Sequence, residues 1–442
     1  MTKRKLLICV VVIFAIFGRL WLTDKAWHVD MWSNAGWGEW IYDHGPAKFY
    51  DNSYWTYAWP TQPPVINSIY AFNKRLHIEL LGRLAWTDFQ LNKILPGDKT
   101  PWLTDFVYWF GYGRVNLEIP FQIGFLVTMK LIPVAADLAI AWLVWLITKK
   151  TYLAVVFLLS PFSWYVSALW GQYDGVGFAL VLGGVYLLYK HKLIMLSPGL
   201  ILLGILIKPT ALILAPFVGY YYLRQTPAKL VVKVLGVVLA GVLFWTTTAP
   251  YTHKNPFEFA WYDLKRIVFE KAEPRVTTNA FNLWRIVTGN KPTNHWNKFL
   301  GIPAVVWGLL AYGAIHVLAI WRIETNRKDR WRMWEGLFVI SAGSFMFMTG
   351  MLDRYLYAGM LFGLILVATQ FRLLKWWLVW SVIFWLNLYN QWWIPASFEP
   401  LKQFMLVYDS IVTRILSGFS VIILVKLLNF KNGSIKTLKK NN

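Results

Sequence analysis

Asp30 is the first residue whose type and position suit chemistry, because it stands among aromatic residues directly after the first apolar run. A carboxylate near a membrane surface but shielded from bulk water can have its pKa adjusted for the work of a general base. Asp30 is therefore our candidate base. A solvated loop carboxylate is the structural alternative for Asp30. Glu39, Asp43 and Asp51 in the same segment compete for the role of base.

Two cations, Lys208 and Arg354, could bind a phosphate group. Lys208 precedes Pro209, and a helix break at a proline frees backbone groups that a cavity or a ligand can satisfy. Arg354 offers a planar fork of donors that matches phosphate, with Asp353 beside it to orient the guanidinium. Snorkelling of Lys208 to the membrane interface and a plain salt bridge at Arg354 are the structural alternatives.

A third group of residues suits the hydroxyl groups of a sugar or an acceptor. The stretch 167–175 places an amide and a carboxylate at a turn between two apolar runs, with a glycine that permits close backbone approach. The candidates for this role are Trp170, Gln172, Asp174, Asn279, Asn282 and Tyr355. An interfacial turn at 167–175 and an amide-capped amphipathic helix after 279–282 are the structural alternatives.

Asp137 lies inside an apolar run, 133–139. A charge at that depth costs about 3 kcal/mol or more, so it must pair or face a cavity. A bond to a neighbouring helix and a functional role both remain open for it.

Membrane-spanning helices must position these residues. The chain is 57% hydrophobic and only 15% charged, and its apolar residues recur in runs of about 15 to 25, the length of a transmembrane helix. The runs do not alternate in polarity, which disfavours a β-barrel. We predict an all-α polytopic membrane protein of about 12 spans, forming one integral-membrane domain over 1–442.

The basic residues predict the orientation in the cell membrane. The formal net charge is +22, and much of the lysine and arginine falls in short loops, which indicates membrane topology rather than nucleic-acid binding. Placing these loops inside puts both termini in the cytoplasm and the candidate site on the outer face. The first apolar run has no small-residue cleavage site after it and is predicted to be an uncleaved transmembrane helix.

Counting basic loops also predicts where the spans and outer loops lie. Two outer loops are expected, 24–118 with amphipathic interfacial helices such as 65–81, and 251–300. The segment 193–223 is predicted to cross twice, breaking near Lys208. The predicted spans are 6–22, 121–147, 152–166, 178–189, two within 193–223, 235–250, 305–320, 336–350, 356–370 and a final pair that turns outside at 391–402.

The sequence predicts no metal cofactor and no cytoplasmic nucleotide donor. Cys9 is the single cysteine, and the seven histidines show no zinc-type spacing. No glycine-rich pattern of a nucleotide-binding fold occurs.

An ordered set of motifs resembles the GT-C superfamily of integral-membrane glycosyltransferases, and within it bacterial proteins related to the mannosyltransferases of GPI-anchor synthesis. Each motif alone is weak, but the order over most of the chain is specific. The motifs are Asp30 after the first helix, 59–64 (WPTQPP), 130–137 (KLIPVAAD), 160–162 (SPF), 170–174 (WGQYD), 207–209 (IKP), 279–284 (NAFNLW) and 353–357 (DRYLY).

The resemblance implies transfer of a mannose-like hexose from a polyprenyl-phosphate donor to a cell-surface glycan or glycolipid. By similarity, Asp30 would deprotonate the acceptor hydroxyl. The phosphate role assigned above to Arg354 and Lys208 agrees with such a donor, because these cations would stabilise the leaving phosphate. Single displacement predicts inversion at the anomeric carbon. The family often has His-Glu before the Arg-Tyr of 354–355, where this chain has Leu352 and Asp353, so the missing histidine leaves Arg354 as the surviving cation.

A transporter or flippase of lipid-linked sugars is the alternative function. Such proteins also carry intramembrane polar residues and broken helices, but they often show two matching halves. Neither 170–174 nor 207–209 recurs in the second half of the chain. A non-catalytic scaffold, the third possibility, would not explain why the candidate residues map to one face.

Overall fold

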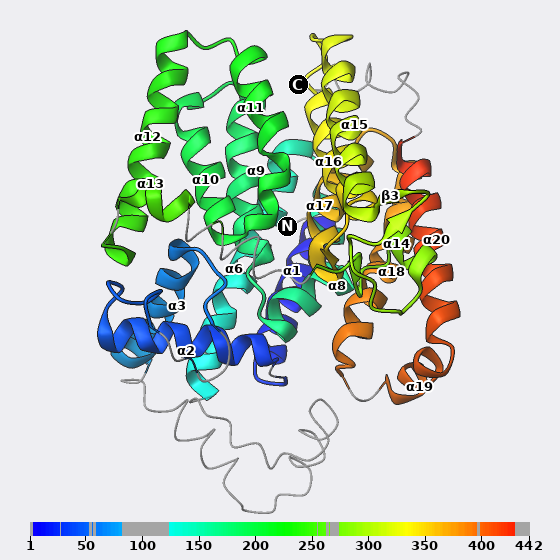
Figure 1. Cartoon of the computed structure of the whole chain (residues 1–442), viewed down its shortest axis with the longest axis horizontal. Helices are drawn as coiled ribbons and strands as arrows, with labels where there is room; N and C mark the ends of the chain where they lie inside the picture. The colour runs from blue at the N-terminus through cyan, green and yellow to red at the C-terminus, as the bar shows by residue number, and fades with distance from the viewer. Residues whose placement is uncertain are drawn as a thin grey trace, which may run out of the picture.

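The computed structural model describes residues 3–26, 28–52, 55, 59–81, 123–253, 255–261, 265, 274–395 and 398–428. Much of the predicted first outer loop, parts of the second and the basic tail therefore lie outside the described residues. The described residues form helices joined by short turns, with strands of two residues each, which confirms the predicted α-helical class (Figure 1).

The N-terminal half forms one group of helices, coloured blue to green in Figure 1. Here α denotes an α-helix and η a short 3-10 or π-helical segment. The elements are α1 (Lys3–Leu22), α2 (Val29–His44), α3 (Pro64–Leu76), η1 (His77–Leu81), α6 (Ile123–Thr148), α7 (Thr151–Leu159), α8 (Pro161–Trp164), η3 (Tyr165–Trp170), α9 (Asp174–Lys190), η4 (Ile194–Leu196), α10 (Ser197–Ile207), η5 (Pro209–Leu214), α11 (Ala215–Arg224), α12 (Leu230–Thr248), η6 (Ala249–Tyr251) and α13 (Pro256–Phe259).

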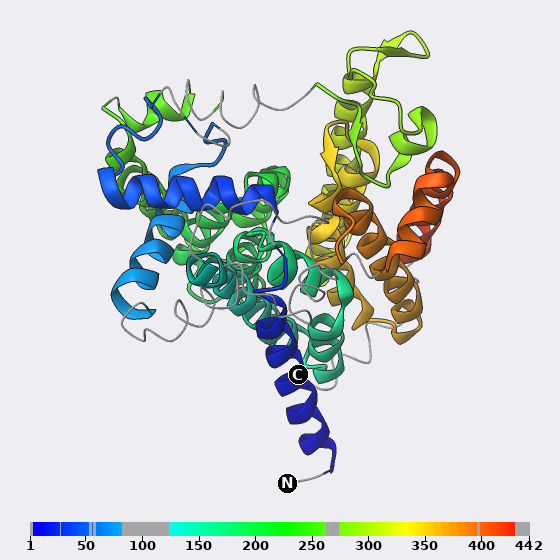
Figure 2. The ribbon, with the colours of Figure 1, turned by 90° about the horizontal axis from the view of Figure 1, so that it is seen from below.

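The C-terminal half forms a second group, which Figure 2 shows on the opposite side from α2, α3 and α12, with α1 projecting from the rest. Short strands in this group connect the second loop to the helices. The elements are β1 (Thr277–Thr278), α14 (Leu283–Thr288), β2 (Lys298–Phe299), β3 (Ile302–Pro303), α15 (Ala304–Glu324), α16 (Arg332–Phe347), β4 (Met351–Leu352), η9 (Asp353–Leu356), α17 (Tyr357–Val367), η10 (Phe371–Leu373), α18 (Leu374–Trp392), α19 (Glu399–Val407) and α20 (Asp409–Leu428).

Among the described residues, four helices are long and apolar enough to cross a membrane: Gly124–Thr148, Leu230–Tyr251, Ala304–Glu324 and Asp409–Leu428. The first three coincide with predicted spans, and the fourth is the second helix of the predicted final pair. These helices have the length and composition for membrane insertion. The count of about 12 spans stays a prediction.

The segment predicted to span at 152–166 contains a bend, which the sequence analysis did not predict. The chain forms α7, breaks at Ser160, and continues through α8 and η3 to Trp170, with a bend of 53°. Pro161 explains the break, because proline lacks the N–H that would continue the helical ladder and disfavours a helical conformation in the residue before it. The bend delivers Trp170 and the turn after it to the candidate site.

The chain reverses direction at Lys208, as the hairpin prediction for 193–223 requires. Helix α10 ends at Ile207, and α11 begins at Ala215 after one 3-10 segment. The two ends of this hairpin, at Met195 and Tyr222, meet the beginning of α12: Gly236 lies against the backbone of Met195, and the Tyr222 hydroxyl donates to the Lys233 carbonyl oxygen at 2.9 Å. The segment is therefore two short helices rather than one long one.

Asp137 has a structural partner. Its carboxylate accepts from Arg19 Nε at 2.9 Å and from the Ser167 hydroxyl at 2.6 Å, and all three side chains are buried. Arg19 also donates to the carbonyl oxygens of Ala15 and Leu158. This ion pair joins α1, α6 and η3, so the structural alternative holds for Asp137.

Candidate functional site

Asp30 lies in the first turn of α2, where the helix dipole favours a carboxylate. The ring of His28 caps this helix by accepting from the Asp30 backbone N–H at 3.1 Å. The Gln172 amide donates to Asp30 Oδ2 at 2.7 Å, and Arg354 Nη1 lies 3.8 Å from the same oxygen. The Asp30 side chain is 36% exposed, so a ligand can reach it.

Gln172 reaches Asp30 because the chain turns sharply after η3. Gly171 adopts a left-handed conformation, φ +78°, and a side chain there would collide with the sulfur of Met31. Only glycine satisfies both the dihedral angle and the close approach. Gly171 therefore allows the turn of 170–174 to pack directly against α2.

Asp174 and Lys208 form a partly buried ion pair between α9 and the end of α10. Lys208 Nζ donates to Asp174 Oδ2 at 2.7 Å, and the carboxylate is 1% exposed. The two helices come close because Gly177 and Gly204 pack backbone to backbone, and a Cβ on Gly177 would lie 2.6 Å from the Lys208 Cβ. Lys208 therefore points into the protein rather than snorkelling.

Arg354 lies in η9, in the C-terminal half of the chain. Strand β4 directly before it pairs in parallel with β1 of the second loop, which fixes the start of η9. The Arg354 guanidinium lies 5.4 Å from the ring centre of Trp170, and Lys208 Nζ lies 5.7 Å from that of Tyr355. The site thus forms where the two groups of helices meet.

The residues that meet at this place form what we call the charged cluster: Asp30, Trp170, Gln172, Asp174, Lys208, Asp353, Arg354 and Tyr355. Several polar atoms in this cluster are buried without a hydrogen-bond partner in the part of the chain that the structure describes. Buried polar atoms in folded proteins are nearly always paired, so a local concentration of unpaired ones indicates positions for a ligand or water. They are Trp170 Nε1, Asp174 Oδ1, Asp353 Oδ2 and Arg354 Nε.

Burial and mutual charge shift the pKa values of the cluster. Burial opposes ionisation of Asp30, but His28, Arg354 and Gln172 outweigh it and lower the pKa of Asp30. Burial raises the pKa of Asp353 to about 7, against the pull of Arg354. Burial also lowers the pKa of Lys208. Asp30 is therefore ionised at neutral pH, whereas Asp353 is balanced between its two forms.

Arg354 stays charged, because the neighbouring carboxylates outweigh the effect of burial and raise its pKa. Burial raises the pKa of Tyr355 to about 12. The Arg354 guanidinium, charged and with its Nε unpaired among the described residues, is therefore the place in the cluster where an anion could bind.

Asn279 and Asn282 occupy different environments. Asn279 forms a bridge to Leu352, next to η9, and donates to the side chain of Gln391. Asn282 is fully buried, caps α14 and donates to the Phe345 carbonyl oxygen at 3.1 Å. The amide-cap alternative therefore describes Asn282, and we leave this residue out of the proposed site.

The competing carboxylates near Asp30 do not join the cluster. Asp43 and Asp51 are exposed, and Glu39 pairs with Lys74. In the described ranges, no group of three or more His, Cys, Asp or Glu side chains could hold a metal ion.

Three residues near the site, His28, Tyr70 and Trp392, were not identified as candidates from the sequence. His28 lies between the rings of Trp170 and Trp392, at 4.8 and 5.1 Å from their centres. Tyr70 of α3 packs edge-on against Tyr173 at 5.1 Å. The helical periodicity of α3 predicts a buried face that includes Tyr70. No local sequence pattern predicts that Trp392, at the end of α18, contacts His28.

Comparison with known proteins adds no relative. The chain matches no protein-family model, and a search of curated proteins finds no significant match.

Proposed function

We propose that the protein is an integral-membrane glycosyltransferase of the GT-C type. It would transfer a mannose-like hexose from a polyprenyl-phosphate donor to a hydroxyl of a cell-surface glycan or glycolipid. One observation carries the proposal: an accessible carboxylate, two partly buried cations and several unpaired polar atoms meet at one point where the two helix groups join. Glycosyl transfer needs this combination of a base, an anion site and hydroxyl-binding groups.

Asp30 is the proposed base. Its exposure leaves room for an acceptor hydroxyl, and the hydrogen bond from Gln172 fixes its orientation. A base works best when its pKa lies near the working pH, whereas the hydrogen bond with His28 and the charge of Arg354 keep the pKa of Asp30 low. A donor phosphate on Arg354 would weaken that attraction and raise the pKa of Asp30 when the base is needed.

Arg354 and Lys208 are the proposed phosphate ligands. Arg354 has a buried Nε without a partner in the described chain, and its guanidinium fork matches a phosphate. As the bond from the anomeric carbon to the phosphate oxygen breaks, negative charge grows on the phosphate, and these cations stabilise it. A lipid phosphate is a good leaving group, so no general acid is required. A single displacement inverts the anomeric carbon.

The remaining residues would bind the sugar or the acceptor. Asp174 offers an unpaired Oδ1, and Trp170 offers its indole N–H. Gln172 donates a hydrogen bond to Asp30, and the ring of Tyr355 lies next to Lys208, so both side chains belong to the same cluster. Asn279 lies beside η9 and can close the site from the second loop. In the proposed reaction the donor and the acceptor are both substrates, and no cofactor takes part.

The proposed topology has about 12 spans, both termini in the cytoplasm and the site on the outer face of the cell membrane. The arginine-rich turn between α15 and α16 and the turn between α11 and α12 lie at one end of the molecule, whereas α2, α3 and α19 lie at the other (Figure 1). The positive-inside rule assigns the basic end to the cytoplasm.

The test is sugar transfer by purified protein in lipid nanodiscs. Polyprenyl-phosphate sugars serve as donors, and the cell's own glycolipids serve as acceptors. Asp30→Asn should lose at least about a hundredfold in rate, the usual effect of removing a general base, with its melting temperature kept. Asp43→Asn, on the same helix but exposed, is the matched control and should keep full activity. Wild-type transfer by Asp30→Asn would remove Asp30 from the mechanism.

Donor binding tests the phosphate site separately. Arg354→Ala should weaken binding of a polyprenyl phosphate by about tenfold or more, since a charge-assisted hydrogen bond is lost. Lys402→Ala, at the surface of α19, should bind as wild type. Unchanged affinity in Arg354→Ala would mean that Arg354 only pairs with Asp30. Movement of a lipid-linked sugar across liposomes without transfer would instead support a flippase.

A further inference from the structure

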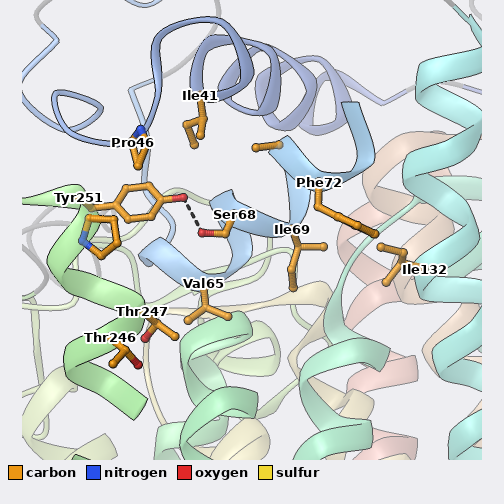
Figure 3. A pocket seen from close by; sticks show the side chains of 12 residues that line it. Ile41, Pro46, Val65, Ser68, Ile69, Phe72, Ile132, Thr246, Thr247 and Tyr251 are labelled. Atoms are coloured by element: carbon orange, nitrogen blue, oxygen red, sulfur yellow. Dashed lines mark hydrogen bonds between the residues drawn. The ribbon is translucent and has the colours of Figure 1, made fainter. Parts of the chain in front are cut away.

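Helix α6 connects two different surfaces of the molecule. In its first half, Ile132 lines an apolar cleft together with side chains of α2, α3 and α12 (Figure 3). No charged side chain contributes to the lining of this cleft. At the end of α6, about 24 Å farther along the helix, cations from three separate turns lie together. We call this group the basic patch: Lys149, Lys190, His191, Lys192 and Arg330.

The packing of α6 against α9 brings the first two turns together. Asp137 of α6 lies beside Gly175, at the beginning of α9. From this contact both helices continue for about three to four turns and end at Thr148 and Lys190. The charge of Lys149 still acts on Lys190 there, so the two helices run in parallel and end side by side.

The turn between α15 and α16 adds Arg330 to this place. The ring of Tyr189, one residue before Lys190, packs against the rings of Trp331 and Trp334, with centres 6.0 and 5.4 Å apart. Arg330 directly precedes Trp331 and is exposed. Three turns that are far apart in the sequence therefore present cations to one region of the surface.

These cations have no carboxylate partner. Among the described residues, none of the four lysine and arginine side chains of the patch forms an ion pair. The carboxylates of the neighbouring turn are engaged, because Glu335 pairs with Arg332 at 2.6 Å and Asp329 accepts from the Trp331 backbone N–H at 3.2 Å. His191 Nε2 is buried without a partner in the same part of the chain. Unpaired cations beside a buried unpaired nitrogen indicate a position for an anion.

The cations also disfavour one another. Burial and the charges of Lys149, Lys192 and Arg330 lower the pKa of Lys190. Burial and the charge of Arg330 lower the pKa of His191. The helix dipole explains one cation at the end of α6 and one at the end of α9, but it does not explain why the third turn adds another. An anion bound among them would relieve the repulsion.

The position of the patch favours an anion that belongs to the membrane. Lys149 directly follows the candidate span Gly124–Thr148, so in the membrane its ammonium group lies at the depth of the lipid headgroups. Apolar side chains stand beside the cations: Trp145, 5.1 Å from Lys149 Nζ, is 39% exposed, and Leu193 is 66% exposed. A phospholipid would contact both kinds of side chain, whereas a free anion would contact only the cations.

We propose that the basic patch binds an anionic phospholipid, with the headgroup phosphate held by the lysines and Arg330 and an acyl chain beside Trp145 and Leu193. Such a lipid would link the N-terminal group of helices to the C-terminal group. The proposal does not rest on the proposed glycosyltransferase function. Helix α9 separates the patch from Asp174 of the charged cluster by about 24 Å.

Thermal unfolding of the full-length protein in nanodiscs tests the proposal. Nanodiscs of phosphatidylcholine alone are compared with nanodiscs that also contain phosphatidylglycerol. Phosphatidylglycerol should raise the melting temperature of wild type by about 3 °C or more, because a ligand of the folded state stabilises it. The triple variant Lys149→Gln, Lys190→Gln, Lys192→Gln should lose most of this increase. In phosphatidylcholine alone it should melt no lower than wild type, since it removes repulsion and no ion pair.

The matched control is the triple variant Arg224→Gln, Lys229→Gln, Lys328→Gln. It removes the same charge from exposed side chains at the turns between α11 and α12 and between α15 and α16, and it should keep the increase. Native mass spectrometry gives a second measurement, in which wild type and control should retain phosphatidylglycerol at collision energies that strip it from the patch variant. Lys149→Gln alone, at an exposed position, replaces the triple variant if the latter does not fold.

Three results would overturn the proposal. An undiminished increase in the patch variant would mean that the lipid acts elsewhere. An equal loss in the control would mean that total charge, and not the patch, sets the effect. An equal increase on adding inorganic phosphate to phosphatidylcholine nanodiscs would identify a free anion as the ligand. None of these results bears on sugar transfer, and inactivity of the protein with every polyprenyl-phosphate donor would leave the lipid site standing.

Discussion

Replacing Asp353 by asparagine should change how the stability of the protein depends on pH. Asp353 is 2% exposed, and burial raises its pKa from 3.8 to about 7. Below about pH 4 the carboxyl group is protonated in both the folded and the unfolded protein, so its contribution to stability is fully present. As the pH rises toward 7, the unfolded state releases the proton and the folded state keeps it, so stability is lost.

The size of this effect follows from the shift. Each pKa unit corresponds to about 1.4 kcal/mol, so wild type should lose up to about 4 kcal/mol relative to Asp353→Asn between pH 4 and pH 8. Asparagine has nearly the same shape and no charge, so the variant keeps the packing. Relaxation around the charged carboxylate would reduce the figure without changing its sign.

Intrinsic tryptophan fluorescence during heating measures this difference in nanodiscs at pH 5, 6, 7 and 8. The melting temperature of Asp353→Asn minus that of wild type should increase with pH and level off above pH 7. Asp43→Asn, an exposed carboxylate outside the cluster, should show no such trend. A difference that is independent of pH, or that falls as the pH rises, would refute the account of Asp353.

Two further predictions concern structural roles. Arg19→Leu should destabilise the protein by about 3 kcal/mol, because it leaves Asp137 charged and buried, and adding Asp137→Leu should restore part of the melting temperature; a double variant no better than the single one would contradict this. Asn282→Ala should cost about 1 kcal/mol for the lost helix cap and leave sugar-binding affinity unchanged, as measured by melting and by titration with methyl mannoside; a selective loss of affinity would return Asn282 to the sugar site.

The candidate site illustrates what local sequence can and cannot predict. Asp30, Asp174, Lys208 and Arg354 were identifiable singly, since a charge next to an apolar run requires a reason. Which of these residues pair with each other could not be predicted, because Lys208 meets Asp174 only through the glycine contact of α9 with α10. The contact between Arg354 and Asp30 joins residues from opposite ends of the chain.

For Asp137 and Asn282, the sequence alone is compatible with both a functional and a structural role. Their partners in the structure indicate the structural role, because Arg19 neutralises Asp137 and the Asn282 side chain caps the beginning of α14. Such partners come from contacts between distant segments, which periodicity and composition do not encode.

The sequence by itself determined that the chain is α-helical and apolar enough for a membrane, where the break at Lys208 falls, and which charged residues need an explanation. These properties depend on residue type and spacing along one helix, which are local. The tertiary structure decided that 151–170 bends, which carboxylates are exposed, and that Lys208 pairs with Asp174. Those outcomes depend on how helices pack side by side, and glycine contacts and buried ion pairs between distant segments set that packing.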